Sequence, residues 1–407
     1  MKTAQQFMTS MRVLGPERLW LLGILTGGHF VIHWFQQFFP VLLPSIKSGL
    51  GLNNVEVGAL TSAQQLVMGV AQLPLGMLAD SMVRHRAAIL ALSLVSMGAA
   101  YFLLGSSVFI WALVGSGLIG LGTALWHPTA AASLSNRFPE RRATALSIHG
   151  TGATLSDTVT PLFVGALLAT FSWQTATQVQ LVPGLLFAFL LWRALAGMFT
   201  DAASPSRRDA TQFRDVLAVI KNPAFLGVSV STGLLTMARL VILTFLPVYL
   251  QEHLNYSAFA LGVFIALLHV MGTLSQPVLG LLSDRFGRKT VLLPSCLLLG
   301  LFFALLAFVP PGIPLGLVII AIGLFFYTLY NIFNAAVMDV AGSNVQASTY
   351  GLMTLITQLV VIPTPMITGY LIGDWGIKFA FILAGAFLVI AGLVIAPLRL
   401  YRGTRNS

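Results

Sequence analysis

The segment Gly76-Met-Leu-Ala-Asp80-Ser-Met-Val-Arg84-His-Arg86 follows a long apolar run, and Gly280-Leu-Leu-Ser-Asp284-Arg-Phe-Gly-Arg288-Lys289 follows another. Each segment combines a glycine, an aspartate and basic residues, which suits a short turn between two membrane helices. The glycine permits a tight backbone, the aspartate suits a helix N-terminus, and the arginines hold the turn at the water interface. The two glycines lie 204 residues apart, about half of the 407-residue chain. This doubled turn predicts a membrane protein built of two similar halves.

The composition excludes an ordinary soluble protein. Apolar residues make up 57% of the chain and charged residues only 8%, whereas soluble domains carry about 25% charged residues. The apolar runs are long and unbroken, which favours membrane helices of about 20 residues over short alternating strands. Because Cys296 is the single cysteine, we expect neither an intrachain disulfide nor a cysteine-built metal site.

We predict an all-α integral membrane protein with twelve transmembrane helices in two six-helix halves. The halves are residues 1–198 and 221–407, and a polar cytoplasmic linker at 199–220 joins them. The predicted spans are roughly 18–44, 55–79, 87–106, 108–135, 142–171, 173–197, 221–250, 258–283, 289–309, 313–340, 346–372 and 375–398.

Three further pairs of identical residues share the 204-residue offset. They are Gln72 with Gln276, Pro161 with Pro365, and Gly165 with Gly369. The second half is therefore predicted to repeat the first in the same order and orientation.

The basic residues gather on one side of the predicted spans. Only Lys47, Lys378 and Arg239 depart from this segregation among the 22 lysines and arginines. The positive-inside rule then places both termini in the cytoplasm. The net charge of +10 is thus a signature of topology, and no nucleic-acid partner is expected.

The second turn, Gly280 to Lys289, nearly matches the G-x-L-x-D-R-x-G-R-[RK] pattern of the major facilitator superfamily, which the chain resembles over essentially its whole length. The first turn departs from that pattern, because Ser81 replaces an arginine and Val83 a glycine. Other pieces resemble the fosmidomycin-resistance-type branch, and this resemblance implies proton-coupled efflux of small drug-like or anionic compounds. These pieces are His29, Gly122-Thr-Ala-Leu-Trp-His127-Pro128, the Gly/Ser-rich stretch before Pro161, and Phe245-Leu-Pro-Val-Tyr-Leu250.

The first predicted span carries a polar stripe. His29 and His33 are four residues apart and share a helix face, which Gln36 and Gln37 continue. Since lipid offers no hydrogen-bond partners, this face should point into a substrate cavity. The alternatives are a histidine that only bonds a neighbouring helix, and a zinc site. No third ligand lies at local metal spacing, so no metal ion is expected.

Two further spans hold candidates for proton coupling. His127 lies between Trp126 and Pro128, where the proline can kink the helix. Asp157 is the single carboxylate well inside a predicted span, and His149 lies about 80° from it around the helix. We assign proton coupling to Asp157, His127 and His149, with substrate contact for Trp126 and His127. The alternative for Asp157 is a fixed counter-ion to Arg239 or to a histidine.

The second half offers an anion site and a polar helix face. Arg239 keeps its charge within span 7 and could bind a carboxylate or phosphate, pair with Asp157, or lie near the interface. Span 10 presents a face spaced as one side of a helix, for which packing between helices is the alternative to a substrate cavity. The substrate-contact candidates of this half are Arg239, Tyr327, Tyr330, Asn331, Asn334 and Gln358.

The doubled turns are candidates for a cytoplasmic gate. We expect Asp284 to face the start of span 5, and Arg285 or Arg288 to pair with Asp339 at the end of span 10. The first turn offers Asp80 and Arg84, but Ser135 occupies the position equivalent to Asp339. We therefore predict an asymmetric gate in which the second turn is the stronger latch. Anchoring at the interface is the alternative.

These features favour a multi-pass secondary active transporter of the bacterial inner membrane over an enzyme. The hypothesis is proton-coupled efflux of small organic, anionic or amphipathic compounds by alternating access. Import of an organic acid with protons is the alternative, and a transport-dead sensor or intramembrane enzyme is a remote one. No phosphate loop is present, so ATP would not drive transport directly. The expected partners are substrate, protons and lipid, without a cofactor, and the chain is expected to be a monomer.

Overall fold

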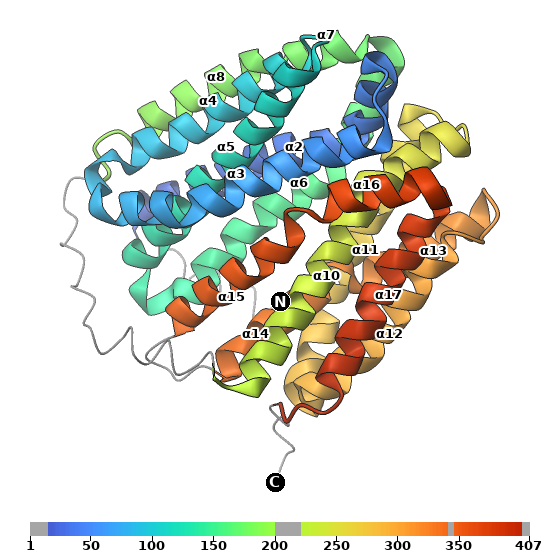
Figure 1. The fold of residues 1–407 in the computed structure, drawn as a ribbon. Helices are drawn as coiled ribbons and strands as arrows, with labels where there is room; N and C mark the ends of the chain where they lie inside the picture. Colours follow the sequence, from blue (N-terminus) through green and yellow to red (C-terminus); the bar gives the residue numbers. More distant parts are fainter. Residues whose placement is uncertain (1–14, 200–220, 341–345, 401–407) are drawn as a thin grey trace. The chain divides into compact units, whose positions relative to one another are not determined.

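The computed structural model describes residues 15–199, 221–340 and 346–400, with the side chains of 143 and 346–351 left undescribed (Figure 1). The predicted linker at 199–220 lies outside these residues except for residue 199. Throughout the described part the chain forms helices joined by short turns. The main helices are α2 (Pro16–Leu50), α3 (Asn54–Ser81), α4 (Arg86–Leu104), α5 (Phe109–Arg137), α6 (Arg142–Thr170), α7 (Trp173–Gln178), α8 (Leu181–Leu195), α10 (Pro223–Val248), α11 (Ala258–Phe286), α12 (Arg288–Leu305), α13 (Ile313–Phe326), α14 (Thr328–Val340), α15 (Gln346–Val361), α16 (Thr364–Trp375) and α17 (Lys378–Ile395).

The all-helical, membrane-spanning prediction agrees with the structure. Within the described residues, 10 helical segments are long and apolar enough to cross a membrane. The long helices α2 and α3 are not among these ten. The predicted count of twelve spans and the cytoplasmic placement of the termini therefore stay predictions.

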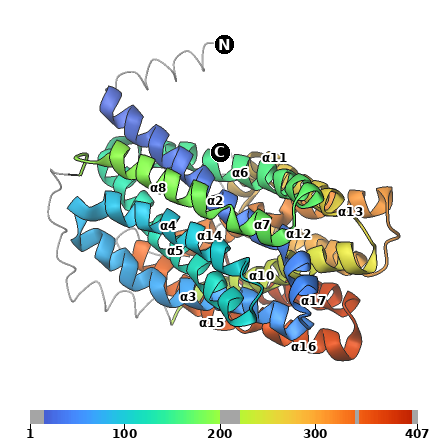
Figure 2. The ribbon, with the colours of Figure 1, turned by 90° about the horizontal axis from the view of Figure 1, so that it is seen from above.

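The chain divides into two compact units. Among the described residues, unit 1 comprises 15–38, 67–160 and 172–199, and unit 2 comprises 39–66, 161–171, 221–340 and 346–400. In unit 1, α4 packs against α5 and α8, and in unit 2, α17 packs against α10 and α12 (Figures 1 and 2). Unit 2 thus includes the end of α2, the beginning of α3 and the end of α6, as well as the helices of the second half.

The two copies of the doubled turn fold differently. In the second copy, Gly287 joins α11 to α12 with φ of 96°, a conformation that residues with a Cβ rarely adopt. The equivalent residue of the first copy is Val83, a β-branched residue for which positive φ is strained. There the chain instead forms a short 3-10 turn, Val83–His85, before α4 begins.

Unit 2 contains a close crossing of α3 and α16. A Cβ atom added at Gly58 would lie 2.3 Å from the carbonyl oxygen of Pro365, and one added at Gly369 would lie 2.2 Å from that of Asn54. Such contacts need glycine, because any side chain would force the two backbones apart.

The crossing of α11 and α6, also in unit 2, repeats this arrangement. A Cβ atom at Gly262 would lie 2.2 Å from the carbonyl oxygen of Pro161, and one at Gly165 would lie 2.6 Å from that of Ala258. All four positions are related to those of the first crossing by the offset of 204 residues. We call the two contacts the glycine crossings. They involve the ends of α3 and α11 that are remote from the doubled turns.

Several predicted spans are interrupted rather than continuous. Span 10 divides into α13 and α14 at Tyr327, and span 11 divides into α15 and α16 beside Pro363. Proline removes a backbone donor and crowds the preceding turn, which explains the second break. After Pro247, α10 continues into a π-helical turn, η3 (Tyr249–His253), where Glu252 pairs with Lys47 within unit 2.

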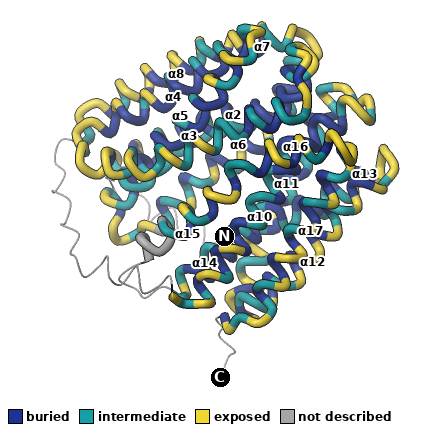
Figure 3. Tube along the Cα trace, viewed as in Figure 1, coloured by how far each residue is buried: buried dark blue, intermediate teal, exposed yellow. Residues whose placement is uncertain are grey.

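Much of α8 is coloured as exposed in Figure 3, and its exposed residues include seven large apolar ones. They are Val182, Leu185, Leu186, Phe187, Phe189, Leu190 and Trp192. Such a surface is costly in water but is matched to lipid tails. This helix therefore presents its face to the membrane.

Candidate functional site

Unit 1 holds a cluster of four imidazole rings, which we call the histidine cluster: His29, His33, His127 and His149. The rings of His29 and His33 lie 4.7 Å apart between centroids, and both lie against His127, at 5.4 and 5.9 Å. His149 stacks on His29 with centroids 4.0 Å apart and planes 4° apart. Three helices, α2, α5 and α6, thus bring together residues that are 120 positions apart.

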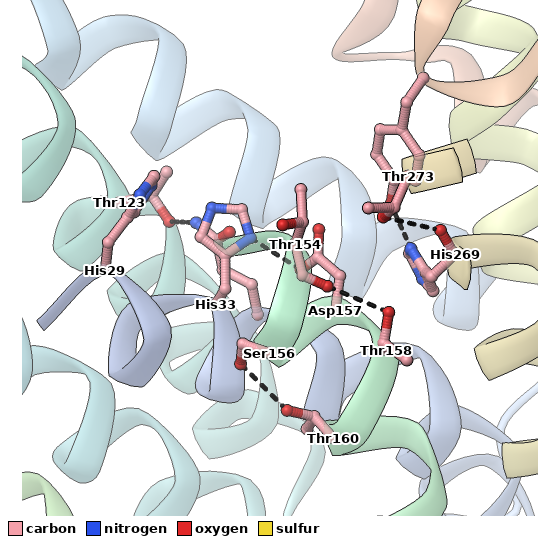
Figure 4. Close-up of polar contacts among 12 residues, drawn as sticks. His29, His33, Thr123, Thr154, Ser156, Asp157, Thr158, Thr160, His269 and Thr273 are labelled. Atoms are coloured by element: carbon pink, nitrogen blue, oxygen red, sulfur yellow. Dashed lines mark hydrogen bonds and ion pairs between the residues drawn. The ribbon is translucent and has the colours of Figure 1, made fainter. Parts of the chain in front are cut away.

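In three of these histidines, the Nδ1 atom forms a hydrogen bond with an oxygen atom. The partner of His29 is the carbonyl oxygen of His149 at 3.0 Å, and that of His127 is the carbonyl oxygen of Thr123 at 3.0 Å. His33 bonds the Asp157 carboxylate at 2.7 Å, and the two side chains face each other in Figure 4. His29, His149 and Asp157 are all buried. The structure thus shows a hydrogen bond between His33 and Asp157, while the counter-ion role of Asp157 stays a prediction.

The rest of the predicted polar stripe surrounds this cluster. Gln36 donates to the Thr123 hydroxyl at 2.8 Å, and Gln37 is buried with Oε1 unpaired among the described residues. Trp126 is completely buried, and its ring occupies the space beside Gly28. Trp126 therefore packs against α2, and its contact with substrate stays a prediction.

Unit 2 holds a second group, which we call the arginine cluster. The Arg239 guanidinium lies 4.6 Å from the centroid of the Phe326 ring, 4.9 Å from that of Tyr327 and 5.7 Å from that of Tyr330. Tyr327 and His269 share a hydrogen bond of 2.5 Å. Stacking on aromatic faces stabilises a guanidinium in a poorly hydrated place. The interruption between α13 and α14 places Tyr327 at this site.

The remaining predicted contacts of the second half also lie in unit 2. Asn331 donates to Gln276 at 3.3 Å, while Asn334 has a buried Oδ1 unpaired among the described residues. Gln358 is buried on α15. Their substrate-binding roles stay predictions, as do the proton-coupling roles of Asp157, His127 and His149.

The turn residues form two different ion-pair arrangements. In the second turn, Arg288 donates to Asp339 at 2.8 Å and also pairs with Asp284, while the Arg285 guanidinium lies over the Phe286 ring. Asp284 thus pairs with Arg288 within its own turn, and its approach to the start of span 5 stays a prediction.

In the first turn, Asp80 lies 3.7 Å from Arg86, and Arg84 is exposed. Arg86 is almost fully buried and donates to the Ala79 carbonyl at 3.0 Å. Our sequence reasoning missed Arg86, although it stands in the turn, because the motif pointed to Arg84.

Other site residues also escaped the sequence analysis. Thr123 lies four residues before His127, so helical spacing could have identified it. Phe326 joins Arg239 through the tertiary fold, and no local pattern connects the two residues.

The chain is similar to known transporters in sequence. The profile of the family described as "Major Facilitator Superfamily" matches residues 25–365. A hexuronate transporter of Bacillus subtilis is 23% identical over 385 residues, covering 88% of this chain and 89% of that protein. The multidrug resistance protein MdtG of Yersinia enterocolitica is 27% identical over 313 residues, covering 75% and 73%.

Solved structures share the fold. A bacterial homologue of the human lysosomal transporter Spinster, in an inward-facing and unoccupied conformation, aligns with a TM-score of 0.79 at 19% identity, covering 94% of this chain and 96% of that one. The nucleoside transporter NupG aligns with a TM-score of 0.73 at 14% identity, covering 92% and 98%.

Proposed function

This chain belongs to the Major Facilitator Superfamily and is a secondary transporter, and we propose that it exports small organic anions or amphipathic compounds in exchange for protons. Alternating access would carry the substrate across the membrane as the two halves rearrange. The observation that carries the proposal is the Arg239 guanidinium, held within a membrane-spanning helix by three aromatic rings.

Arg239 supports an anionic substrate on chemical grounds. A permanent charge at membrane depth costs several kcal/mol, so it is retained where it serves a function. Aromatic rings contact the flat faces of a guanidinium, whereas an oxyanion binds along its edge through two parallel N–H donors. The two kinds of contact can therefore coexist in the arginine cluster.

The direction and the driving ion are inferred from the relatives and from the sequence. The MdtG relatives, whose name denotes multidrug resistance, favour efflux. The lack of a nucleotide-binding motif in the sequence points to an ion gradient as the energy source. Protons are the expected coupling ion, and the finer resemblance to the fosmidomycin-resistance-type branch stays a prediction.

Import of an organic acid together with protons is the second candidate. It is favoured by the hexuronate transporter, which covers more of this chain than MdtG does. A hexuronate carries a carboxylate, so this candidate uses Arg239 in the same way and differs only in coupling and direction.

Proteoliposomes that contain a lumenal pH dye distinguish these candidates. Addition of an anionic substrate should raise the lumenal pH if substrate entry is exchanged for proton exit. A fall in lumenal pH would establish co-transport with protons and overturn the exchange. Substrate flux with no pH change would overturn proton coupling altogether.

The anion site is tested with an Arg239→Gln variant. Its affinity for anionic ligands should fall about 10- to 100-fold, because a hydrogen bond to a charged group contributes about 1.5–3 kcal/mol. Affinity for neutral ligands should remain. The exposed Arg193 of α8 provides the matched control, since Arg193→Gln removes the same charge from the lipid-facing helix. Equal losses for anionic and neutral ligands would show that Arg239 is structural.

A further inference from the structure

The histidine cluster has the composition of a metal site, although its residues are dispersed in the sequence. His29, His33 and His127 can each present one ring nitrogen, and these three nitrogens all lie within 4.8 Å of one another. The first two come from α2 and the third from α5. Neutral imidazole is a ligand that zinc and other late first-row metal ions prefer.

The hydrogen bonds fix which nitrogen of each ring is available. A carbonyl oxygen only accepts, so Nδ1 of His29 and Nδ1 of His127 must carry the protons that they donate. When the Asp157 carboxylate is ionised, it likewise accepts from Nδ1 of His33. In all three neutral rings the lone pair is therefore on Nε2. Metal-binding histidines characteristically donate their second ring N–H to a carbonyl or carboxylate in this way.

One of these nitrogens has no other role in the described residues. Nε2 of His29 is buried and has no hydrogen-bond partner. A histidine that only pinned two helices together would need its Nδ1 contact alone, and it would leave this buried lone pair unsatisfied at a cost. Bound metal removes that cost, and the stacked His149 ring limits the rotation of His29.

We propose that His29, His33 and His127 bind one divalent transition-metal ion of the zinc class through their Nε2 atoms. Three ligands leave a fourth tetrahedral position open for water or a small oxyanion. Metal–nitrogen bonds of about 2.0–2.1 Å require the three Nε2 atoms to close around the ion, and the rings are near enough for this because one nitrogen of each lies within 4.8 Å of the others. Asp157 positions His33 and supplies a negative charge that offsets the ion.

The site excludes the common hard cations on the same grounds. Mg²⁺ and Ca²⁺ select oxygen ligands in six-fold or higher coordination, whereas these three ligands are nitrogens. The inference goes beyond the proposed function, because it depends neither on the direction of transport nor on Arg239.

Co²⁺ and Zn²⁺ titrations of the full chain, purified without a histidine tag, test the proposal. We expect one Co²⁺ per chain with the intense visible absorption of a tetrahedral site, displaced by one equivalent of Zn²⁺ and unaffected by excess Mg²⁺. Absence of a tetrahedral Co²⁺ spectrum together with absence of Zn²⁺ binding would overturn the proposal, as would displacement by Mg²⁺.

Variants locate the ion. His29→Gln and His127→Gln should each lower the Zn²⁺ affinity more than about 100-fold, and Asp157→Asn should lower it about 10- to 100-fold through His33. The control is His85→Gln, which removes an exposed histidine from the same unit and should bind as the parent does. Far-UV circular dichroism and thermal unfolding without metal identify variants that fail to fold. Parent-like affinity in a folded His29→Gln or His127→Gln protein would overturn the assignment.

A transport assay is not needed for this test, so its outcome is separate from that of the proposed function. If the parent protein binds no metal but still carries out proton-coupled flux, only the metal site is rejected. Metal binding without any flux of organic anions would reject the proposed function alone.

Discussion

Replacing Gly262 by alanine should separate the glycine crossings. The added methyl group would stand 2.2 Å from the carbonyl oxygen of Pro161 and 3.5 Å from the Cα atom of Gly165. A carbon and a carbonyl oxygen approach to about 3.3 Å, so α11 and α6 must move apart by about 1 Å. Because both opposing groups are backbone, no rotation of a side chain relieves the clash.

The magnitude follows from the cost of overpacking, about 1–3 kcal/mol. A conformation in which the crossings have separated does not carry this cost, so the variant favours it. A shift of about 2 kcal/mol changes the ratio of closed to separated molecules about 30-fold.

Thiol labelling at the other crossing measures this ratio. Thr61 lies on α3 one turn beyond Gly58, is 4% exposed, and its hydroxyl lies 3.4 Å from that of Thr244. A Thr61→Cys thiol should react with a maleimide only when the crossings separate. The labelling rate should rise about 30-fold with Gly262→Ala, provided that opening is fast and the two crossings open together. The native thiol, Cys296, is fully buried, and its background is measured in the protein that keeps Thr61.

The matched control is Gly373→Ala on α16. No atom lies within 4 Å of a Cβ at this position, so the variant changes helix propensity without a clash. Equal labelling rates in the folded Gly262→Ala and Gly373→Ala variants would refute the claim that close backbone contact at the crossings keeps the Thr61 site closed to the reagent. A rise that is confined to cysteines on α6 and α11 would refute the coupling between them.

Three further outcomes are expected. Gly28→Ala should lower the free energy of unfolding by about 1–3 kcal/mol and weaken Zn²⁺ binding, because the added Cβ would lie 2.1 Å from a carbon of the Trp126 indole. The adjacent Gly27→Ala is the control: its Cβ meets open space, so it should change neither property. If the second turn is the stronger latch, Arg288→Gln should increase labelling of a cytoplasmic cysteine more than Arg86→Gln does; the reverse order would contradict the asymmetric gate. The pKa of Glu140 is held below its ordinary value of 4.5, first by a hydrogen bond from its own backbone amide and then by Arg18. The parent protein should therefore be more stable than the Glu140→Gln variant above pH 4.5, and this difference in the free energy of unfolding should disappear as the pH falls through the lower pKa of the folded state.

The repeat could be predicted from the sequence because backbone contacts require it. Gly165 and Gly369 share the 204-residue offset, and the structure places both where a helix backbone meets a carbonyl oxygen. The sequence could not show which helix each glycine meets, since that depends on contacts between distant segments. Local rules likewise missed the break at Tyr327, where neither glycine nor proline stands in the chain.

The histidine cluster marks the limit of the same reasoning. The spacing of four residues identified His29 and His33 as one face of a helix. It gave no third ligand, because His127 comes from another helix and lies 94 positions beyond His33 (127 minus 33). Metal ligands that meet only in the tertiary fold leave no local spacing pattern.

The helix-packing residues therefore follow the 204-residue repeat in this protein, whereas the residues of the candidate site do not. The residues at the glycine crossings have counterparts of matching function in the other half, since each crossing needs its own close approach. None of the four positions equivalent to the histidine cluster carries a histidine. The position equivalent to His29 is Gly233, and that of His33 is Met237.

The residues of the arginine cluster, in the second half, likewise have no equivalents of the same type in the first half. The first-half position equivalent to Arg239 is Phe35, and that of Tyr327 is Thr123. A symmetric substrate would favour matched ligands in both halves, whereas these clusters offer imidazole nitrogens in one unit and a guanidinium in the other. Each cluster therefore takes its ligands from one half alone, so neither could be inferred from the repeat that located the glycine crossings.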